Sequence, residues 1–189
     1  MSSLIQSLVD FLYSLIYSLP FFTPTSQTPQ KTVLLGLQNS GKSTFLSPQT
    51  QHEPTLRPLS KSLTIGSRQF ITFDLGGQSN LRSLWSDYVV TGVLVIFVID
   101  VYNFSVVSEE VKEEFEKVKD TCGILAVVFN KIDLSPNEKI EDLKELLLDE
   151  EEGEDEDIGY FLTSGLKGEG VREVFEWLGE RVEEGRKGE

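Results

Sequence analysis

The sequence predicts a three-layer α/β fold in which helices cover both faces of a six-stranded, mostly parallel sheet. Strand-like and helix-like segments alternate from Lys31 onward, which is typical of folds with a parallel sheet. The segments VLVIFVI at 93–99 and ILAVVF at 124–129 are apolar on both faces, which indicates burial between two layers of helices. Gly66 and Ser67 separate two alternating runs, so we expect a hairpin and one antiparallel strand.

Hydrophobic periodicity places the remaining elements. An amphipathic helix is expected at 4–19, because apolar residues recur there at three- and four-residue steps and Ser7 and Asp10 face the other side. Residues 20–30, with three prolines, form a linker to a domain at 31–189. Strands are expected near 32–37, 61–66, 69–74, 93–99, 124–129 and 159–163. Helices are expected near 42–47, 79–88, 105–120, 138–149 and 170–184.

The acidic residues are concentrated in the second half of the chain. The net charge is −14, yet residues 1–100 carry six Lys/Arg and five Asp/Glu. The acidic run DEEEGEDED at 149–157 predicts a solvated loop, with a docking site for a basic partner as the alternative. Such a balance argues against nucleic acid as a partner. The single cysteine, Cys122, excludes an internal disulfide and fits a reducing compartment.

The segment GLQNSGKS at 36–43 matches the phosphate-binding pattern GxxxxGK[ST], between an apolar strand and the start of a helix. In this pattern backbone N–H groups surround the phosphates, and the helix N-terminus adds positive charge. Lys42 would neutralise phosphate oxygens, and the Ser43 hydroxyl would ligate Mg²⁺. The predicted phosphate-binding residues are Asn39, Ser40, Gly41, Lys42, Ser43 and Thr44.

The segment NKID at 130–133 directly follows a strand and predicts selectivity for guanine. The Asp133 carboxylate can accept hydrogen bonds from N1–H and the exocyclic amine of guanine, whereas adenine would leave it unpaired. Asn130 would tie this loop to the phosphate loop, and the Lys131 stem would pack on the base. After the last strand, the backbone N–H groups of Gly165 and Leu166 can face guanine O6.

The segment DLGGQ at 74–78 ends another strand and predicts a phosphate sensor. Asp74 can hold a Mg²⁺-bound water and Thr55 can complete the Mg²⁺ shell, so the predicted metal site is Ser43, Thr55 and Asp74. The Gly77 N–H can reach the γ-phosphate, and both contacts are lost when that phosphate leaves. Gln78 is placed to orient the attacking water. The predicted catalytic residues are Gln78, Lys42 and Thr55.

Four segments resemble the small GTPases of the Arf/Sar family, and within it the Sar group. They are QHEPTLRP at 51–58, SLTIGSRQFITFDLGG at 62–77, LRSLWSDYV at 81–89 and FLTSGLKGEGVREVFEWL at 161–178. The form DLGGQ separates this family from Ras and Rab relatives. The resemblance covers nearly the whole chain and implies the P-loop GTPase fold, with GTP or GDP and Mg²⁺ as cofactors.

The resemblance to the Sar group also implies partners and a location. It implies recruitment of the inner COPII coat and its cargo adaptor for ER-to-Golgi transport, and loading by an exchange factor of the ER membrane. It further implies slow intrinsic hydrolysis, accelerated roughly 10³–10⁵-fold by an arginine from the coat. The expected location is the cytoplasmic face of the ER membrane, with the Golgi as an alternative. The GDP form is expected to be a cytosolic monomer.

Two features keep other functions open. Gln78 stands where Sar members carry histidine, and only the twelve residues 42–53 separate Gly41 from Pro54, about five fewer than in the family. The first favours an Arf-like GTPase at another membrane. The second favours a scaffold that binds GTP without useful hydrolysis.

Residues 4–19 are interpreted as an interfacial membrane helix. As a helix they would extend only ~24 Å, whereas a bilayer core measures ~30 Å. A transmembrane span is therefore a weaker alternative. A secretory signal is also weaker, because neither leading basic residues nor a small-residue cleavage site appears, and packing on the domain itself is a third alternative. Ser2 excludes N-myristoylation. We expect this helix to lie in a groove with GDP, and to be expelled with GTP when the hairpin at 61–73 shifts.

Overall fold

The computed structural model describes residues 28–48, 52–90, 92–148 and 155–187. The predicted helix at 4–19 and most of the acidic run at 149–157 lie outside these residues. Among the described residues, no helix is both long and apolar enough to cross a membrane.

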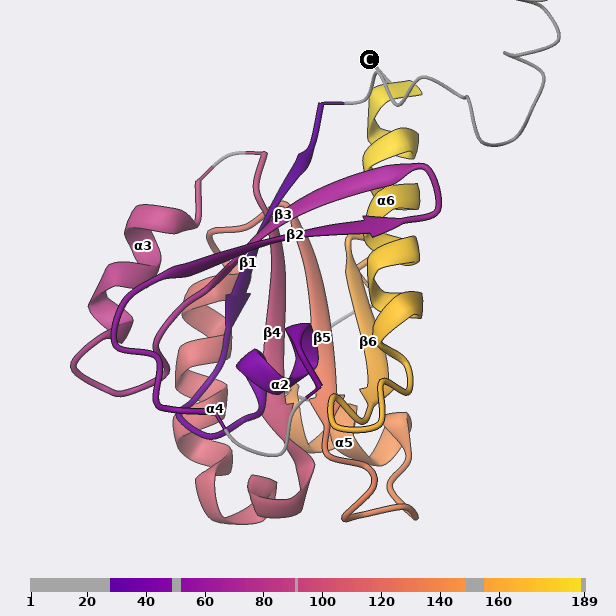
Figure 1. The fold of residues 1–189 in the computed structure, drawn as a ribbon. Coiled ribbons are helices and arrows are strands. Elements are labelled where there is room, and N and C mark those ends of the chain that lie inside the picture. Colours follow the sequence, from indigo (N-terminus) through magenta and orange to yellow (C-terminus); the bar gives the residue numbers. More distant parts are fainter. Residues whose placement is uncertain (1–27, 49–51, 91, 149–154, 188–189) are drawn as a thin grey trace, which may run out of the picture.

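The sheet has the six strands that the sequence predicts, in the order β2-β3-β1-β4-β5-β6 (Figure 1). The strands are β1 (Gln30–Leu35), β2 (Leu59–Ile65), β3 (Arg68–Asp74), β4 (Leu94–Asp100), β5 (Ile124–Asn130) and β6 (Ile158–Thr163). Strand β2 pairs antiparallel with β3 through the Gly66–Ser67 turn, and the other pairs are parallel. The predicted fold class is therefore confirmed.

The helices are α2 (Lys42–Leu46), α3 (Trp85–Tyr88), α4 (Phe104–Lys119), α5 (Ile140–Leu147) and α6 (Val171–Lys187). Two 3₁₀ turns, η1 (Arg82–Leu84) and η2 (Val101–Asn103), precede α3 and α4. Helix α2 has only five residues and ends at Leu46, with Ser47 as its C-cap, as expected from the nearby Pro48. Strand β2 begins two residues before the predicted start.

The predicted single helix at 79–88 is wrong. Residues up to Leu84 form turns with i→i+3 hydrogen bonds, from Leu81 to Gln78 and from Leu84 to Leu81, and the α-helix begins only at Trp85. Ser79 and Asn80 favour such turns over a helix. The indole of Trp85 also donates to the Gly76 carbonyl at 3.1 Å, which holds this segment close to the end of β3.

Two hydrophobic layers enclose the sheet, because alternate strand residues point to opposite faces. Helices α3, α4 and α5 cover one face, where Phe97 packs between Trp85 and Phe115. Helices α2 and α6 cover the other, where Phe175 contacts Phe45 and Phe70. Strand β4 is buried along its whole length, as its apolar sequence predicts.

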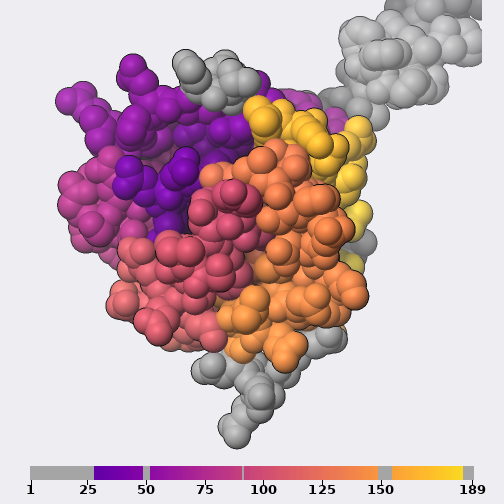
Figure 2. Space-filling model, turned by 90° about the horizontal axis from the view of Figure 1, so that it is seen from below, coloured from indigo at the N-terminus to yellow at the C-terminus, as the bar shows by residue number. Residues whose placement is uncertain are grey.

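The topology brings the predicted site segments together. Strands β1, β3, β5 and β6 run parallel, so the loops that follow them emerge at one edge of the sheet. Ligands in open α/β sheets bind at this edge. Viewed from this end, the indigo segment after β1 lies between purple and magenta segments on one side and orange segments on the other (Figure 2).

Candidate functional site

The phosphate loop, residues 36–41, connects β1 to α2 and wraps around the Lys42 side chain. Lys42 is 6% exposed, and its Nζ donates to the carbonyl oxygens of Gly36 at 2.9 Å and Leu37 at 2.8 Å. Burial lowers the pKa of Lys42 to about 8; Asp74 opposes this shift, while Arg82 and Lys131 add to it. The ammonium is therefore held inside the loop, at the place where the sequence predicts phosphate oxygens.

The three predicted metal ligands converge, although they come from three separate segments. The Ser43 hydroxyl donates to Asp74 Oδ2 at 2.5 Å and lies 3.2 Å from the Thr55 hydroxyl. Thr55 donates to the same carboxylate oxygen at 3.4 Å. A helix, a loop and a strand end thus place three oxygen ligands in one small cluster.

These residues suit a hard divalent cation such as Mg²⁺. Asp74 is 3% exposed, and burial raises its pKa. Its other oxygen, Oδ1, is buried and has no hydrogen-bond partner among the described residues. A buried carboxylate with a spare oxygen beside two hydroxyls is stabilised by a positive charge. The donor set therefore fits Mg²⁺, which the sequence also predicts.

A cavity of about 420 Å³ lies beside this cluster. Its lining includes the predicted residues Asn39, Gly41, Lys42, Ser43, Thr44, Thr55, Gly77 and Gln78. Gly77 lies directly against the phosphate loop: a Cβ there would be 2.4 Å from the Gly36 carbonyl oxygen. Only glycine permits this approach, so the segment after β3 is held at the edge of the cavity. The sole histidine, His52, also lines the cavity, and its Nε2 lies 3.0 Å from the Ser47 carbonyl.

The predicted guanine-binding residues form a second group, joined to the first by Asn130. The Asn130 Nδ2 donates to the Ser40 carbonyl at 2.9 Å. Its Oδ1 accepts from the Gly165 backbone N–H at 2.8 Å and from the Thr163 hydroxyl at 3.1 Å. The buried Asn130 amide therefore links the loop after β5 to the phosphate loop, as the sequence predicts. It also links that loop to the loop after β6, which the sequence did not predict.

The two candidate base-contacting side chains have partners that sequence reasoning missed. The Asp133 Oδ1 accepts from the Ser164 hydroxyl at 2.6 Å. The Lys131 Nζ pairs with Asp100 at 2.8 Å, and Asp100 is 8% exposed at the end of β4. Asp100 could have been noticed in the sequence, because it is an acidic residue directly after the apolar run 93–99, at the sheet edge where the site segments lie. Leu166 is 47% exposed, so only its backbone is suited to the predicted role.

A further missed contact involves the hairpin of β2 and β3. The Lys61 Nζ donates to the Leu46 carbonyl and lies 3.0 Å from the Ser47 hydroxyl. It thereby satisfies the C-terminus of the five-residue helix α2, where carbonyl groups lack partners. Nothing in the local sequence around Lys61 indicates this contact, because its partners are 14 and 15 residues away.

Comparison with known proteins identifies relatives over most of the chain. The model of the ADP-ribosylation factor family matches residues 21–182. The chain is 30% identical to the small COPII coat GTPase SAR1B of Dictyostelium discoideum, over 90% of this chain and 94% of that protein. It is 33% identical to the human ADP-ribosylation factor-related protein 1, over 77% of this chain and 81% of that protein.

A solved structure has the same fold. The Arl6 (BBS3) small GTPase of Trypanosoma brucei, with the bound nucleotide analogue GppNp, superposes with a TM-score of 0.60 at 27% sequence identity. The match covers 83% of this chain and 99% of that one.

Proposed function

Because the chain belongs to the ADP-ribosylation factor (Arf) family of small GTPases, we propose that it is a Sar-type member that recruits a COPII coat to the ER membrane. As a member of the family it binds guanine nucleotide and hydrolyses GTP. Arf-family GTPases act with membranes, exchange factors and GTPase-activating proteins. The proposal concerns which membrane and which coat this GTPase serves, and which residues perform each step.

In the proposed mechanism the phosphate loop binds GTP and the three-residue oxygen cluster senses its terminal phosphate. The observation that best supports this mechanism is that the side chains of Ser43, Thr55 and Asp74 lie in contact with one another. These residues would hold Mg²⁺, which when bound supplies positive charge against the phosphate oxygens. Lys42 offsets further negative charge. The Gly77 N–H would donate to the terminal phosphate, so the segments that carry Thr55 and Gly77 would both be released after hydrolysis.

Hydrolysis is assigned to a water molecule oriented by Gln78. The water oxygen bonds to the γ-phosphorus while the bond from that phosphorus to the β–γ bridging oxygen breaks. One proton of the water passes to an oxygen of the released phosphate, and the products are GDP and phosphate. Little covalent chemistry is left to the protein, so positioning and charge decide the rate. Asp133 selects guanine, because its carboxylate accepts from two donors of that base and from Ser164.

The match along nearly the whole length of a Sar relative supports the Sar assignment. A second candidate, an Arf-like GTPase at another membrane, is supported by similar identity to ADP-ribosylation factor-like protein 3 of Saccharomyces cerevisiae, 29% over 82% of this chain. Gln78 also favours this candidate, because Sar members carry histidine at that position.

Recruitment of purified coats to liposomes distinguishes the two candidates. The full chain, loaded with a non-hydrolysable GTP analogue, is expected to retain the inner COPII coat on ER-like liposomes and not to retain Arf-dependent coats. With GDP neither coat is expected to bind. Recruitment of an Arf-dependent coat alone would support the second candidate instead.

A pair of threonine variants serves as the internal control for this assay. Thr55→Val removes a hydroxyl of the proposed metal site and is expected to abolish recruitment with the analogue. Thr64→Val makes the same chemical change on an exposed position of β2 and is expected to recruit normally. Equal recruitment by both variants would contradict the role proposed for Thr55.

A further inference from the structure

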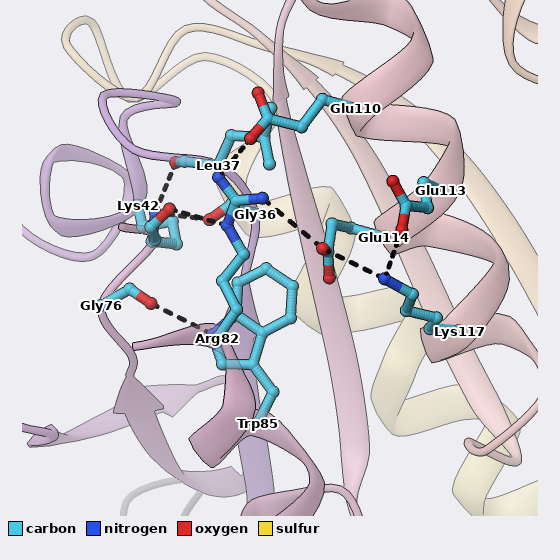
Figure 3. Close-up of polar contacts among 11 residues, drawn as sticks. Gly36, Leu37, Lys42, Gly76, Arg82, Trp85, Glu110, Glu113, Glu114 and Lys117 are labelled. Carbon is cyan, nitrogen blue, oxygen red and sulfur yellow. Dashed lines mark hydrogen bonds and ion pairs between the residues drawn. The ribbon is translucent and has the colours of Figure 1, made fainter. Parts of the chain in front are cut away.

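A largely buried arginine, Arg82, contacts the candidate site from outside the nucleotide cavity. Arg82, in the turn η1, has an 11% exposed side chain and is not among the described residues that line that cavity. It lines a second cavity of about 390 Å³, between the phosphate loop and α4. Figure 3 shows its guanidinium reaching from the segment after β3 toward α4. A largely buried cation outside the nucleotide cavity needs a structural or positioning explanation.

Arg82 connects a backbone carbonyl of the site to two carboxylates of α4. Its Nε donates to the Gly77 carbonyl at 3.0 Å. One terminal nitrogen pairs with Glu110 at 2.7 Å and the other lies 3.5 Å from Glu114. Glu114 is also largely buried, with 16% of its side chain exposed. Three groups thus hold the guanidinium in one orientation, which a fork of five donors suits and an ammonium does not.

The Gly77 carbonyl belongs to the peptide unit that continues into Gln78. A peptide unit is planar, so fixing its oxygen also fixes the direction of the Gln78 N–H and the position of the Gln78 Cα. The catalytic orientation proposed for the Gln78 side chain starts from that Cα. A misplacement of about 1 Å at a catalytic group can cost roughly 10²-fold in rate. Arg82 is therefore well placed to control the reaction without touching the nucleotide.

We propose that Arg82 is the positioning residue for Gln78, and that it transfers the rigidity of α4 to the segment after β3. The helix is suited to this role because Val111 and Phe115 anchor it in the core. This inference rests on the proposed catalytic role of Gln78. It goes further in one respect: Glu110 and Glu114 of α4, acting through Arg82, determine the position of Gln78.

Single-turnover hydrolysis of preloaded GTP by the full chain tests the inference. Arg82→Lys keeps the charge but cannot satisfy all three partners, so hydrolysis is expected to slow by about tenfold, the effect of losing a charged hydrogen bond. GTP and GDP affinities are expected to stay within about twofold, because no nucleotide contact is lost. An unchanged hydrolysis rate would overturn the inference, as would an equal loss of rate and affinity.

A second variant tests the acids and covers failure of Arg82→Lys to fold. The double change Glu110→Gln and Glu114→Gln is expected to slow hydrolysis several-fold, again without loss of affinity. The matched control is Glu113→Gln on the same helix, because Glu113 pairs with Lys117 at 2.9 Å and is 69% exposed. A normal rate in the double variant, or an equal loss in the control, would overturn the inference.

A double-mutant cycle with Gln78→Leu separates this inference from the proposed function. If Arg82 acts through Gln78, Arg82→Lys adds less than about a twofold effect once Gln78 is absent. If Arg82→Lys slows hydrolysis by the same factor with Gln78 present and with Gln78→Leu, the positioning role of Arg82 is overturned, while the proposed function stands. If Gln78→Leu hydrolyses GTP at the parental rate, the catalytic role of Gln78 fails, and the inference fails with it. If Gln78→Leu is slow but Arg82→Lys is not, only the inference fails.

Discussion

The Ser43 hydroxyl donates to one carboxylate oxygen and contacts a second hydroxyl, so its small size and its oxygen both matter. Ser43→Asn replaces the hydroxyl with a bulkier amide beside Asp74. We expect Mg²⁺-dependent GTP affinity to fall by about 10- to 100-fold, the range for lost contacts to charged groups, with a smaller loss for GDP. Titration with fluorescent nucleotides, with Mg²⁺ and with a chelator, measures both.

The control for this prediction is Ser62→Asn, the same change on an exposed position of β2. It is expected to leave both affinities unchanged. If Ser43→Asn keeps the parental preference for GTP in Mg²⁺, the oxygen cluster is not the metal site.

The lowered pKa of Lys42 predicts that nucleotide binding depends on pH and is accompanied by proton uptake. Its pKa is about 8 without nucleotide, because burial disfavours the charged form. Phosphates stabilise the ammonium and raise this pKa, so binding takes up a proton above pH 8 and none well below it. The contribution of Lys42 to affinity therefore falls by up to about tenfold for each pH unit above 8.

Calorimetry of GDP binding in two buffers with different ionisation enthalpies measures this uptake. We expect almost no uptake near about pH 7 and nearly one proton near about pH 9. Equal heats in the two buffers at the higher pH would show that Lys42 is already protonated in the nucleotide-free protein.

At the scale of elements, helix α2 and the loop after β6 are packed too closely for a side chain at Gly165. A Cβ there would lie 2.9 Å from the backbone N and Cα of Phe45. Gly165→Ala must therefore displace either the loop or the helix, and with it the hydrogen bond from the Gly165 N–H to Asn130. We expect GDP to dissociate about tenfold faster, because this loop is assigned to guanine.

Release of a fluorescent GDP derivative measures this rate. The matched control is Gly123→Ala, because a Cβ at Gly123 meets no atom within 4 Å. An unchanged rate in Gly165→Ala would mean that the loop after β6 does not restrain the nucleotide.

The sequence could predict those elements whose character is carried by neighbouring residues in the chain. The strand at 93–99 is uniformly apolar, and the phosphate loop and NKID each carry their chemistry in consecutive residues. The helix predicted at 79–88 was wrong because Ser79 and Asn80 favour turns and because the Gly77 and Gly76 carbonyls hold Arg82 and Trp85. The contacts of Lys61 with α2 and of Arg82 with α4 could not be assigned, since these partners are distant in sequence and only the folded chain brings them together.

At the scale of the whole molecule, the β2–β3 hairpin is held at both ends in the position that brings Thr55 to the oxygen cluster. Near one end Lys61 contacts the end of α2. At the other end Arg68 pairs with Glu183 of α6 at 3.0 Å. A sliding hairpin would break both contacts. They therefore stabilise the arrangement in which Thr55 reaches Ser43 and Asp74, and we infer that this arrangement corresponds to the GTP form.

This arrangement predicts the membrane behaviour of the full chain. With a non-hydrolysable GTP analogue the protein is expected to float with liposomes, and with GDP to remain in solution, because we propose that the helix predicted at 4–19 is released only when the hairpin shifts. Arg68→Gln weakens the hold on the hairpin and is expected to lower the floated fraction by about twofold to fivefold, the range for a partly exposed ion pair.

The matched control for flotation is Arg172→Gln, because Arg172 pairs with Glu176 within α6 and is 70% exposed. It is expected to float like the parent protein. If the parent floats equally with GDP and with the analogue, nucleotide and membrane are not coupled through the hairpin. If the parent floats only with the analogue and Arg68→Gln floats as well as the parent, the coupling stands and the ion pair with Glu183 of α6 contributes nothing to it.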